Sequence, residues 1–311
     1  MEKVWINTKT LIKLNEPIVA CIGYFDGVHK GHQALIKKTL EIANKNQTKS
    51  AMITFDQNPA IIAKGLSKLE LLTTLDDRIQ LAQNLGIEQV IILEFDREMA
   101  KMSTCQFIDN ILLRLPLVAL VCGFDFKFGA LASGNSQTLT NDDNIDFPVY
   151  VVDEIKKGQQ KISSSQITNY LKNADIASAN MLLGYLYSLK GTVINGRKKG
   201  REIGFPTANI LLSDNYILPQ NGVYAGIIEV EGKKYKTMIN IGHNPTFNYR
   251  DDVSVEAHIL DFDQDIYGEK VKLEFNVFLR EECKFSNVHQ LIAQLEIDRN
   301  MTQEYFRGKE I

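Results

Sequence analysis

The chain has few cysteines and little net charge, and each shortage disfavours a class of protein. Four cysteines lie scattered along the chain without a C-x-x-C pair, at Cys21, Cys105, Cys122 and Cys283. This usage fits reduced thiols in a cytoplasm better than a disulfide scaffold or a zinc site. A formal net charge of −3 gives no overall basic field, so we expect neither nucleic acid nor a membrane surface as partner. Lys and Arg gather only in short clusters, at 197–201 and 233–236, which ordinary surfaces also carry.

Long apolar segments, repeats and low-complexity stretches are also missing. No apolar run reaches the ~18 residues of a membrane span, and no basic start precedes an apolar core at the N-terminus. We therefore expect a cytoplasmic protein that is neither secreted nor inserted in a membrane. A chain of 311 residues that is 44% hydrophobic and 23% charged can bury sizeable cores, and its length favours two domains.

The first half of the chain alternates strand-like with helix-like segments. Strand patterns fall at 18–24, 50–55, 89–93, 117–122 and 149–152, and helical patterns between them include 34–43, 75–85 and 103–113. This alternation predicts a Rossmann-like α/β domain, with a parallel sheet covered by helices on both faces. Ligands of such a sheet bind beyond the carboxyl ends of its strands.

The pattern changes after a short helix at 176–183, which Asp175 caps and Gly184 ends. Strand-like stretches then follow one another without helices between them, at 187–194, 223–230, 235–241, 253–260 and 271–279. Turn residues punctuate them, as in a small antiparallel β-barrel. An amphipathic pattern at 286–307 predicts a closing helix. We expect an α/β domain over 1–183 and a barrel domain over 184–311.

The segment GYFDGVHKGHQ at 23–33 follows a predicted strand and precedes a predicted helix. Its glycines let the backbone approach a ligand closely, and His29 and His32 can share one face of the first helical turn. Backbone N–H groups and the helix dipole add to the imidazoles, which favours a triphosphate site for nucleotidyl transfer. Alternatively, the histidines only cap the helix or lie on the surface, and an isolated H-x-x-H would favour that interpretation.

A second glycine-rich segment, GTVINGRKKGREIGFPTANI, spans 191–210. Its glycines punctuate a basic loop that could fold around phosphates. Thr207 and Asn209 lie two apart in an extended segment and therefore project to the same side. Their hydroxyl and amide oxygens suit Mg²⁺ that also holds nucleotide phosphates. Spacing alone does not separate this interpretation from a plain glycine-rich hairpin with a proline turn.

The first motif resembles the H-x-G-H signature of nucleotidyltransferases, in the form found in the FMN adenylyltransferase module of prokaryotic bifunctional riboflavin kinase/FAD synthetases. TFDQNP (54–59), CGFDFKFG (122–129) and KISSSQI (161–167) resemble further motifs of that module, in order and spacing. The resemblance implies that His29 and His32 stabilise the transferring phosphate. It also implies nucleotide contacts at Gly23, Phe25, Gly31, Ser163, Ser164 and Ser165, and flavin contacts at Phe55, Asp125 and Phe128.

Several residues depart from the module's pattern. Asn58 replaces its usual histidine, Gln57 replaces a proline, and Thr168 replaces the arginine of the I-S-S motif. The segment after Gly129 also lacks the basic residues common there. Loss of a charge-assisted phosphate contact costs about 1.5–3 kcal/mol unless a residue such as Lys161 or Lys127 compensates. These departures favour a weakened adenylyltransferase site.

The second motif resembles the riboflavin kinase signature, and GVYAG (222–226), NIGHNPTF (240–247), VEAHILDFDQDIYG (255–268) and FLREECKF (278–285) continue the match. The resemblance implies that Glu256 is the catalytic base, which suits a carboxylate near a Mg²⁺-bound γ-phosphate. It places nucleotide contacts at Gly196, Gly200 and Gly204, Mg²⁺ at Thr207 and Asn209, and flavin beside Arg280. Arg280 could instead form a surface ion pair with Glu281 or Glu282.

We therefore expect a transferase that makes FMN from riboflavin and ATP in its second domain and FAD from FMN and ATP in its first. Mg²⁺, ATP and the flavins are the implied cofactors and substrates, and a monomer or weak homo-oligomer is expected. One alternative is a riboflavin kinase whose adenylyltransferase site is weakened or lost. The other is a flavin-binding regulatory protein without turnover, which the presence of His29, His32 and Glu256 disfavours.

Overall fold

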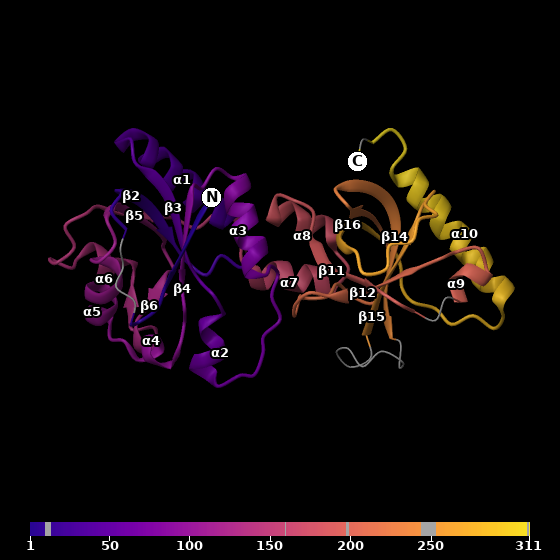
Figure 1. The fold of residues 1–311 in the computed structure, drawn as a ribbon, viewed down its shortest axis with the longest axis horizontal. Helices are drawn as coiled ribbons and strands as arrows, with labels where there is room; N and C mark the ends of the chain where they lie inside the picture. The colour runs from indigo at the N-terminus through magenta and orange to yellow at the C-terminus, as the bar shows by residue number, and fades with distance from the viewer. Residues whose placement is uncertain (10–13, 159, 197–198, 244–252, 310) are drawn as a thin grey trace. The chain divides into compact units, whose positions relative to one another are not determined.

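The computed structural model describes residues 1–9, 14–158, 160–196, 199–243, 253–309 and 311. Internal contacts divide the chain into two compact units, Met1–Ser164 and Ser165–Ile311 (Figure 1). Part of the basic cluster at 197–201 and part of the motif at 240–247 lie outside the described residues. Helices α7 (Ser164–Lys172) and α8 (Ile176–Leu183) belong to the second unit apart from the first residue of α7. The domain boundary after residue 183 stays a prediction.

The first unit is built on a six-stranded parallel sheet, which confirms the predicted α/β fold. Its strand order is β1-β4-β3-β2-β5-β8, and every neighbouring pair is parallel. The strands are β1 (Glu2–Ile6), β2 (Ile18–Ile22), β3 (Lys49–Phe55), β4 (Gln89–Leu93), β5 (Leu117–Gly123) and β8 (Val149–Val152). The edge strand β1 was not predicted from the sequence. Only Ile6 of its five residues is buried, so the strand needs no long apolar run.

Helices cover both faces of this sheet. Alternate residues of β2 separate the two cores: Val19 and Cys21 pack with α1 (Lys30–Asn46) and α3 (Leu75–Asn84), whereas Ala20 and Ile22 face the other side. That other side is covered by α4 (Arg97–Lys101), α5 (Thr104–Phe107), the π-helical turn η1 (Ile108–Leu112) and α6 (Ser136–Thr140). The helix predicted at 103–113 is thus α5 followed by η1. Shorter elements are α2 (Pro59–Lys64), η2 (Ala130–Ala132), β6 (Lys127–Phe128), β7 (Gly134–Asn135), β9 (Lys156–Lys157) and β10 (Gln160–Lys161).

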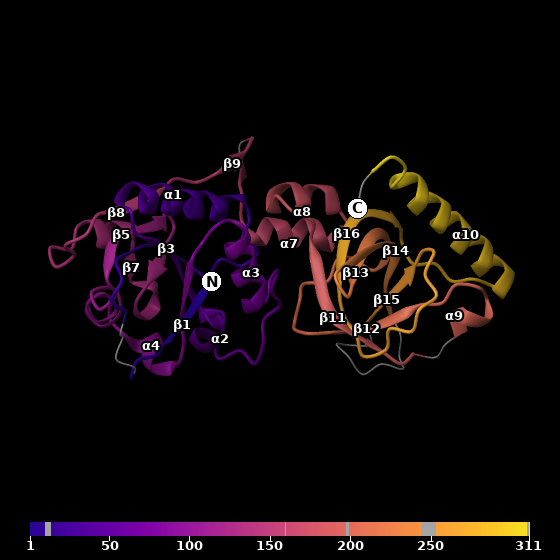
Figure 2. The same ribbon diagram turned by 45° about the horizontal axis from the view of Figure 1, so that its top comes forward.

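The second unit is a closed antiparallel barrel, as predicted. Its strand order is β11-β12-β15-β14-β13-β16. The strands are β11 (Ser188–Ile194), β12 (Ala208–Leu212), β13 (Gly222–Val230), β14 (Lys233–His243), β15 (Val253–Ile259) and β16 (Lys270–Arg280). The short α9 (Lys199–Glu202) precedes β12. The closing helix α10 (Val288–Tyr305) packs along β13 and β14, and is the yellow helix beside the barrel in Figure 2.

Within the part of the chain that the structure describes, none of the helices is both long and apolar enough to cross a membrane.

Candidate active sites

The H-x-G-H loop connects the end of β2 to the start of α1. Phe25 and Val28 have φ angles of 60° and 35°, a region that residues with a β-carbon rarely adopt, and Gly27 has a φ of 80°. His29 is the N-cap residue of α1. Strained backbone of this kind is characteristic of functional loops, and the loop lies at the carboxyl end of a central strand, where parallel sheets bind ligands.

The structure brings His29 and His32 together, as the sequence predicts. Their rings stack with centroids 3.8 Å apart and planes 15° apart, and His29 Nδ1 accepts a 3.4 Å hydrogen bond from the His32 backbone N–H. A β-carbon at Gly31 would lie 3.0 Å from His29 Cε1, so this glycine leaves room for the ring. Phe25, which is 1% exposed, contacts the His32 ring edge-on from the core.

Burial keeps both imidazoles neutral. Desolvation lowers the pKa of His29 to about 4, and the charge of Lys161 adds to this effect. The pKa of His32 is also well below its usual value, through burial first and then through the charges of His29, Arg78 and Lys161. At neutral pH the pair therefore offers N–H donors and lone pairs rather than positive charge.

Lys161 supplies a cation beside the histidine pair. Its ammonium forms an ion pair with Asp125 and lies 4.6 Å from the ring centroid of Phe124. Next to it in the chain, the I-S-S motif reaches the H-x-G-H loop, because Ser164 Oγ donates a 2.9 Å hydrogen bond to the Asp26 carbonyl. This bond joins residues 138 positions apart, so the two motifs lie together in the folded unit.

Of the predicted flavin residues of this unit, Phe55 and Phe128 lie on the face covered by α4, α5 and α6, whereas Asp125 is exposed and pairs with Lys161. Phe55 and Phe128 are buried in the same core cluster, and Phe55 packs edge-on against Phe95. Asn58, one of the departures from the family pattern, caps α2 by accepting a 2.9 Å hydrogen bond from the Ala60 N–H. Its change from histidine therefore still leaves a residue suited to beginning this helix.

Sequence reasoning missed Arg78, which lies 1% exposed beneath the H-x-G-H loop. Its Nη1 donates to the carbonyls of Tyr24 (2.7 Å) and Phe55 (3.1 Å), and so joins the segments that follow β2 and β3. A signal was present in the sequence. Arg78 occupies the apolar stripe of α3 with Leu75, Ile79 and Ala82, where a charge needs buried partners.

In the second unit, glycines of the basic loop allow close packing around Asn209. A β-carbon at Gly196 would lie 2.1 Å from Asn209 Nδ2, and one at Gly200 would lie 2.2 Å from the Phe205 carbonyl oxygen. Gly204 has a φ of 83°. Gly196 and Gly200 therefore fix the shape of the loop by steric necessity, and Gly204 by its backbone conformation.

The predicted base and metal-binding residues converge at one point of the barrel. Thr207 Oγ1 donates a 3.3 Å hydrogen bond to Glu256 Oε2. Asn209 of β12 pairs directly with Glu256 of β15 in the strand register, and Asn240 of β14 pairs with Glu256 on its other side. Asn240 was missed as a candidate, because only the register between strands distant in sequence places it there.

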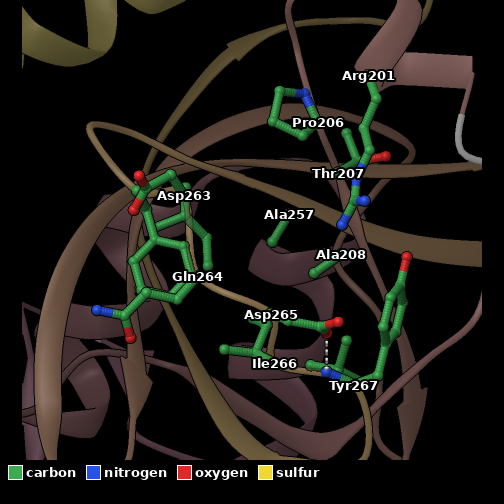
Figure 3. A pocket seen from close by; sticks show the side chains of 13 residues that line it. Arg201, Pro206, Thr207, Ala208, Ala257, Asp263, Gln264, Asp265, Ile266 and Tyr267 are labelled. Carbon is green, nitrogen blue, oxygen red and sulfur yellow. Dashed lines mark hydrogen bonds between the residues drawn. The ribbon is translucent and has the colours of Figure 1, made fainter.

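Two cavities meet at this cluster. One, of about 410 Å³, is lined by residues that include Arg201, Asp263, Gln264 and Tyr267, and Figure 3 shows these side chains around it. The other, of about 320 Å³, is lined by Glu256 and by apolar side chains that include Phe205, Met238, Phe285 and Leu295. Among the described residues, Thr207 alone lines both cavities.

Strand β15 forms the wall between the two cavities. Glu256 and His258 line the smaller cavity, whereas Ala257 and Ile259 line the larger one. This division follows from the two-residue period of a strand. In the larger cavity the Asp265 carboxylate accepts a 3.1 Å hydrogen bond from the Tyr267 N–H, the dashed line in Figure 3.

Arg280 lines the smaller cavity and is bound to α10. Its Nε and Nη2 donate to the Asp298 carboxylate, and its Nη1 donates to the Glu281 carbonyl. The surface ion pair that the sequence left open is therefore not its main contact, since Asp298 is fully buried.

Each unit of the chain matches a known protein family. Residues 11–166 match the FAD synthetase family and residues 183–306 match the riboflavin kinase family, which makes the chain a transferase with two catalytic domains. Proteins named bifunctional riboflavin kinase/FMN adenylyltransferase are 39% identical in Listeria monocytogenes, over 93% of this chain and 92% of theirs, and 32% identical in Escherichia coli, over 94% and 93%. The chain belongs to this bifunctional family.

A solved structure of similar fold comes from Streptococcus pneumoniae. It has a TM-score of 0.88 and 31% identity, and the match covers 97% of this chain and 99% of that one. Its title describes a macrolide-efflux protein. The likeness in fold therefore extends over both units of the chain.

Proposed function

We propose that the barrel unit transfers the γ-phosphoryl group of ATP to riboflavin, and that the α/β unit transfers AMP from ATP to the resulting FMN. The observation that carries the kinase assignment is the position of Thr207, which lines both cavities and donates to Glu256. A phosphoryl donor in one cavity and a hydroxyl acceptor in the other would meet at that point.

The two cavities suit different ligands. The larger cavity has the polar side chains Arg201, Asp263 and Gln264, which suit a nucleotide. The smaller cavity combines Phe205, Met238 and Leu295 with Glu256, which suits a flat apolar ring with a hydroxylated chain. We assign ATP to the larger cavity and riboflavin to the smaller one.

Phosphoryl transfer then requires few groups. Glu256 accepts the proton of the terminal ribityl hydroxyl while that oxygen forms a bond to the γ-phosphorus. The bond between the γ-phosphorus and the β,γ-bridging oxygen breaks, and ADP leaves. Asn209 and Asn240 pair with Glu256 on either side and so hold in place strand β15, which carries the Glu256 carboxylate.

Thr207 and Asn209 are the residues that would hold Mg²⁺. Their oxygens are hard ligands beside Glu256, and no group of three or more His, Cys, Asp or Glu side chains that could hold a metal occurs among the residues described. This donor set fits Mg²⁺ shared with nucleotide phosphates, which keeps few protein ligands. When bound, Mg²⁺ would neutralise charge on the transferring phosphoryl group.

Adenylyl transfer in the α/β unit needs alignment and charge stabilisation rather than a nucleophilic side chain. A phosphate oxygen of FMN attacks the α-phosphorus of ATP, and the bond to the bridging oxygen of pyrophosphate breaks. We assign neutral His29 and His32, the N-terminus of α1 and Ser163–Ser165 to hydrogen bonding with the phosphates. Lys161, whose charge reaches both histidines, supplies the positive charge that Thr168 lacks.

One experiment separates this function from its alternatives. Purified protein is incubated with riboflavin, ATP and Mg²⁺, and riboflavin, FMN and FAD are separated by chromatography. Sequential appearance of FMN and FAD supports both assignments. FMN without FAD leaves a kinase whose adenylyltransferase site is lost, the alternative that Thr168 motivates. Absence of both products from folded protein would favour the regulatory role.

We also propose a cytoplasmic location for this chemistry. All four cysteines are free in the structure, including the exposed Cys105 and Cys283. Exposed free thiols fit a reducing compartment.

A further inference from the structure

His258 contacts the segment that carries Thr207, and nothing above assigns it a role. Its Nδ1 lies 2.7 Å from the carbonyl oxygen of Pro206, the residue just before Thr207. Its ring also packs against Phe205, with centroids 5.2 Å apart and planes inclined by 53°. One side chain of β15 therefore holds both residues that precede Thr207.

The hydrogen bond fixes the tautomer of this imidazole. A proline carbonyl only accepts, so Nδ1 must carry the proton. Burial lowers the pKa of His258, with the charge of Arg299 acting in the same direction and the Pro206 carbonyl and Asp261 opposing it. The ring is therefore neutral at pH 7, protonated on Nδ1, with an unprotonated Nε2.

His258 also shares the strand face of Glu256, two residues away, and lines the same cavity. The side chain that holds the Thr207 segment and the side chain that receives the Thr207 hydrogen bond thus project from one short stretch of β15. A shift of that segment would change the distance between Thr207 Oγ1 and Glu256, now 3.3 Å.

We infer that His258 is a positioning residue of the kinase reaction, which sets the place of Thr207 between the two cavities through its Nδ1–H bond to Pro206. The inference rests on the proposed kinase function. It assigns no proton transfer to His258, because the only proton involved remains on Nδ1 throughout the reaction.

Two variants separate the hydrogen bond from the ring. His258→Asn keeps an N–H donor near the position of Nδ1 but loses the ring. His258→Phe keeps the ring against Phe205 but loses the donor. His289→Phe is the matched control, because His289 is an exposed histidine of α10 outside both cavities.

The measurements are kcat and KM for FMN formation at several Mg²⁺ concentrations, with thermal unfolding and riboflavin binding as checks of folding. We expect His258→Phe to lower kcat about tenfold and to raise the Mg²⁺ concentration for half-maximal rate, while riboflavin still binds. His258→Asn is expected to keep most of the wild-type kcat, and His289→Phe all of it.

Equal losses in the Asn and Phe variants would overturn the inference, because they would show that the imidazole itself is required. A Phe variant with wild-type kcat and Mg²⁺ dependence would also overturn it. Failure of the wild-type protein to form FMN would instead refute the proposed function, so the two failures are distinguishable.

Discussion

Arg280 and Asp298 are joined by a forked pair of contacts, with Nε 2.9 Å from Oδ1 and Nη2 2.7 Å from Oδ2. Asp298 is fully buried in α10, so Arg280 at the end of β16 neutralises a charge that has no access to water. The pair ties the closing helix to the cavity assigned to flavin. Such a pair adds little net stability relative to an apolar pair, but loss of one partner is costly.

We therefore predict that Arg280→Ala destabilises the barrel unit by about 3–5 kcal/mol, because it leaves the buried Asp298 carboxylate without a countercharge. Urea unfolding followed by circular dichroism measures the change. Arg307→Ala is the control, since Arg307 pairs with Glu304 on the surface, where exposed fractions are 77% and 61%. That control is expected to change stability by less than about 1 kcal/mol. Equal losses of unfolding free energy in both variants would contradict a specific role for the Arg280–Asp298 pair.

Replacement of the proposed base separates the two activities. Glu256→Gln keeps the size of the side chain but cannot accept the ribityl proton. We expect FMN formation to fall by at least about 10²-fold, while FAD formation from supplied FMN continues at the wild-type rate. Chromatography of both reactions gives the answer. Parallel loss of the two activities in folded protein would refute the two-site assignment.

A methyl group placed at Gly196 tests the packing of the glycine-rich loop. Its carbon would lie 2.1 Å from Asn209 Nδ2, so Gly196→Ala must displace Asn209 or the loop. We expect a loss of kinase activity and a higher requirement for Mg²⁺, measured by titration of the FMN-forming rate. Gly268→Ala is a useful comparison, because a β-carbon there meets nothing within 4 Å, although Gly268, unlike Gly196, has an unfavourable φ of 83°. A kinase defect of equal size in Gly268→Ala would contradict a specific effect of the clash with Asn209.

The buried histidines make the stability of the α/β unit depend on pH. His29 has a pKa of about 4 in the folded state, against 6.5 for a free imidazole, so the unfolded chain binds a proton first as the pH falls. Stability is therefore full above pH 6.5 and decreases from there to about pH 4, by on the order of 3 kcal/mol for this group. Thermal unfolding between pH 4 and 8 measures the slope. His29→Gln is expected to flatten it, and an unchanged slope would contradict the burial of a neutral His29.

Lys161 is predicted to compensate for Thr168 in the adenylyltransferase site. Lys161→Ala removes the cation beside His29 and His32, and we expect FAD formation to fall about 10- to 100-fold with unchanged FMN formation. Lys101→Ala is the control, because Lys101 is an exposed lysine of α4 outside the motifs of this site. The opposite substitution, Thr168→Arg, should raise the rate of FAD formation. A rate insensitive to Lys161 would show that the phosphate charge is neutralised elsewhere.

The sequence predicted the architecture well where periodicity is strong. The predicted bounds of β4, β8 and α8 coincide with the structure, because continuous apolar runs and clear caps mark their ends. Two strands were not predicted from the sequence. Strand β1 lies at the edge of its sheet with one buried residue, and β12 was expected only as an extended segment.

The candidate sites were predictable as motifs but not as arrangements. His29 and His32 could be expected to meet because helical spacing is local, whereas their loss of charge depends on burial that the motif does not encode. Asn240 joins Glu256 through strand register, and Arg78 lies 54 residues after Tyr24, whose carbonyl it binds. These contacts arise from tertiary structure rather than from local sequence.

The alternating side chains of β15 separate the cavity assigned to ATP, the phosphoryl donor, from the cavity assigned to riboflavin, the acceptor. Ala257 and Ile259 face the larger cavity, and Glu256 and His258 face the smaller one, so a change at Ala257 or Ile259 leaves the side chains that line the smaller cavity intact. Selection can therefore adjust nucleotide preference in the cavity assigned to ATP without altering tolerance for flavin analogues in the other. Thr207 cannot vary in this way, because any substitution there alters the lining of both cavities at once.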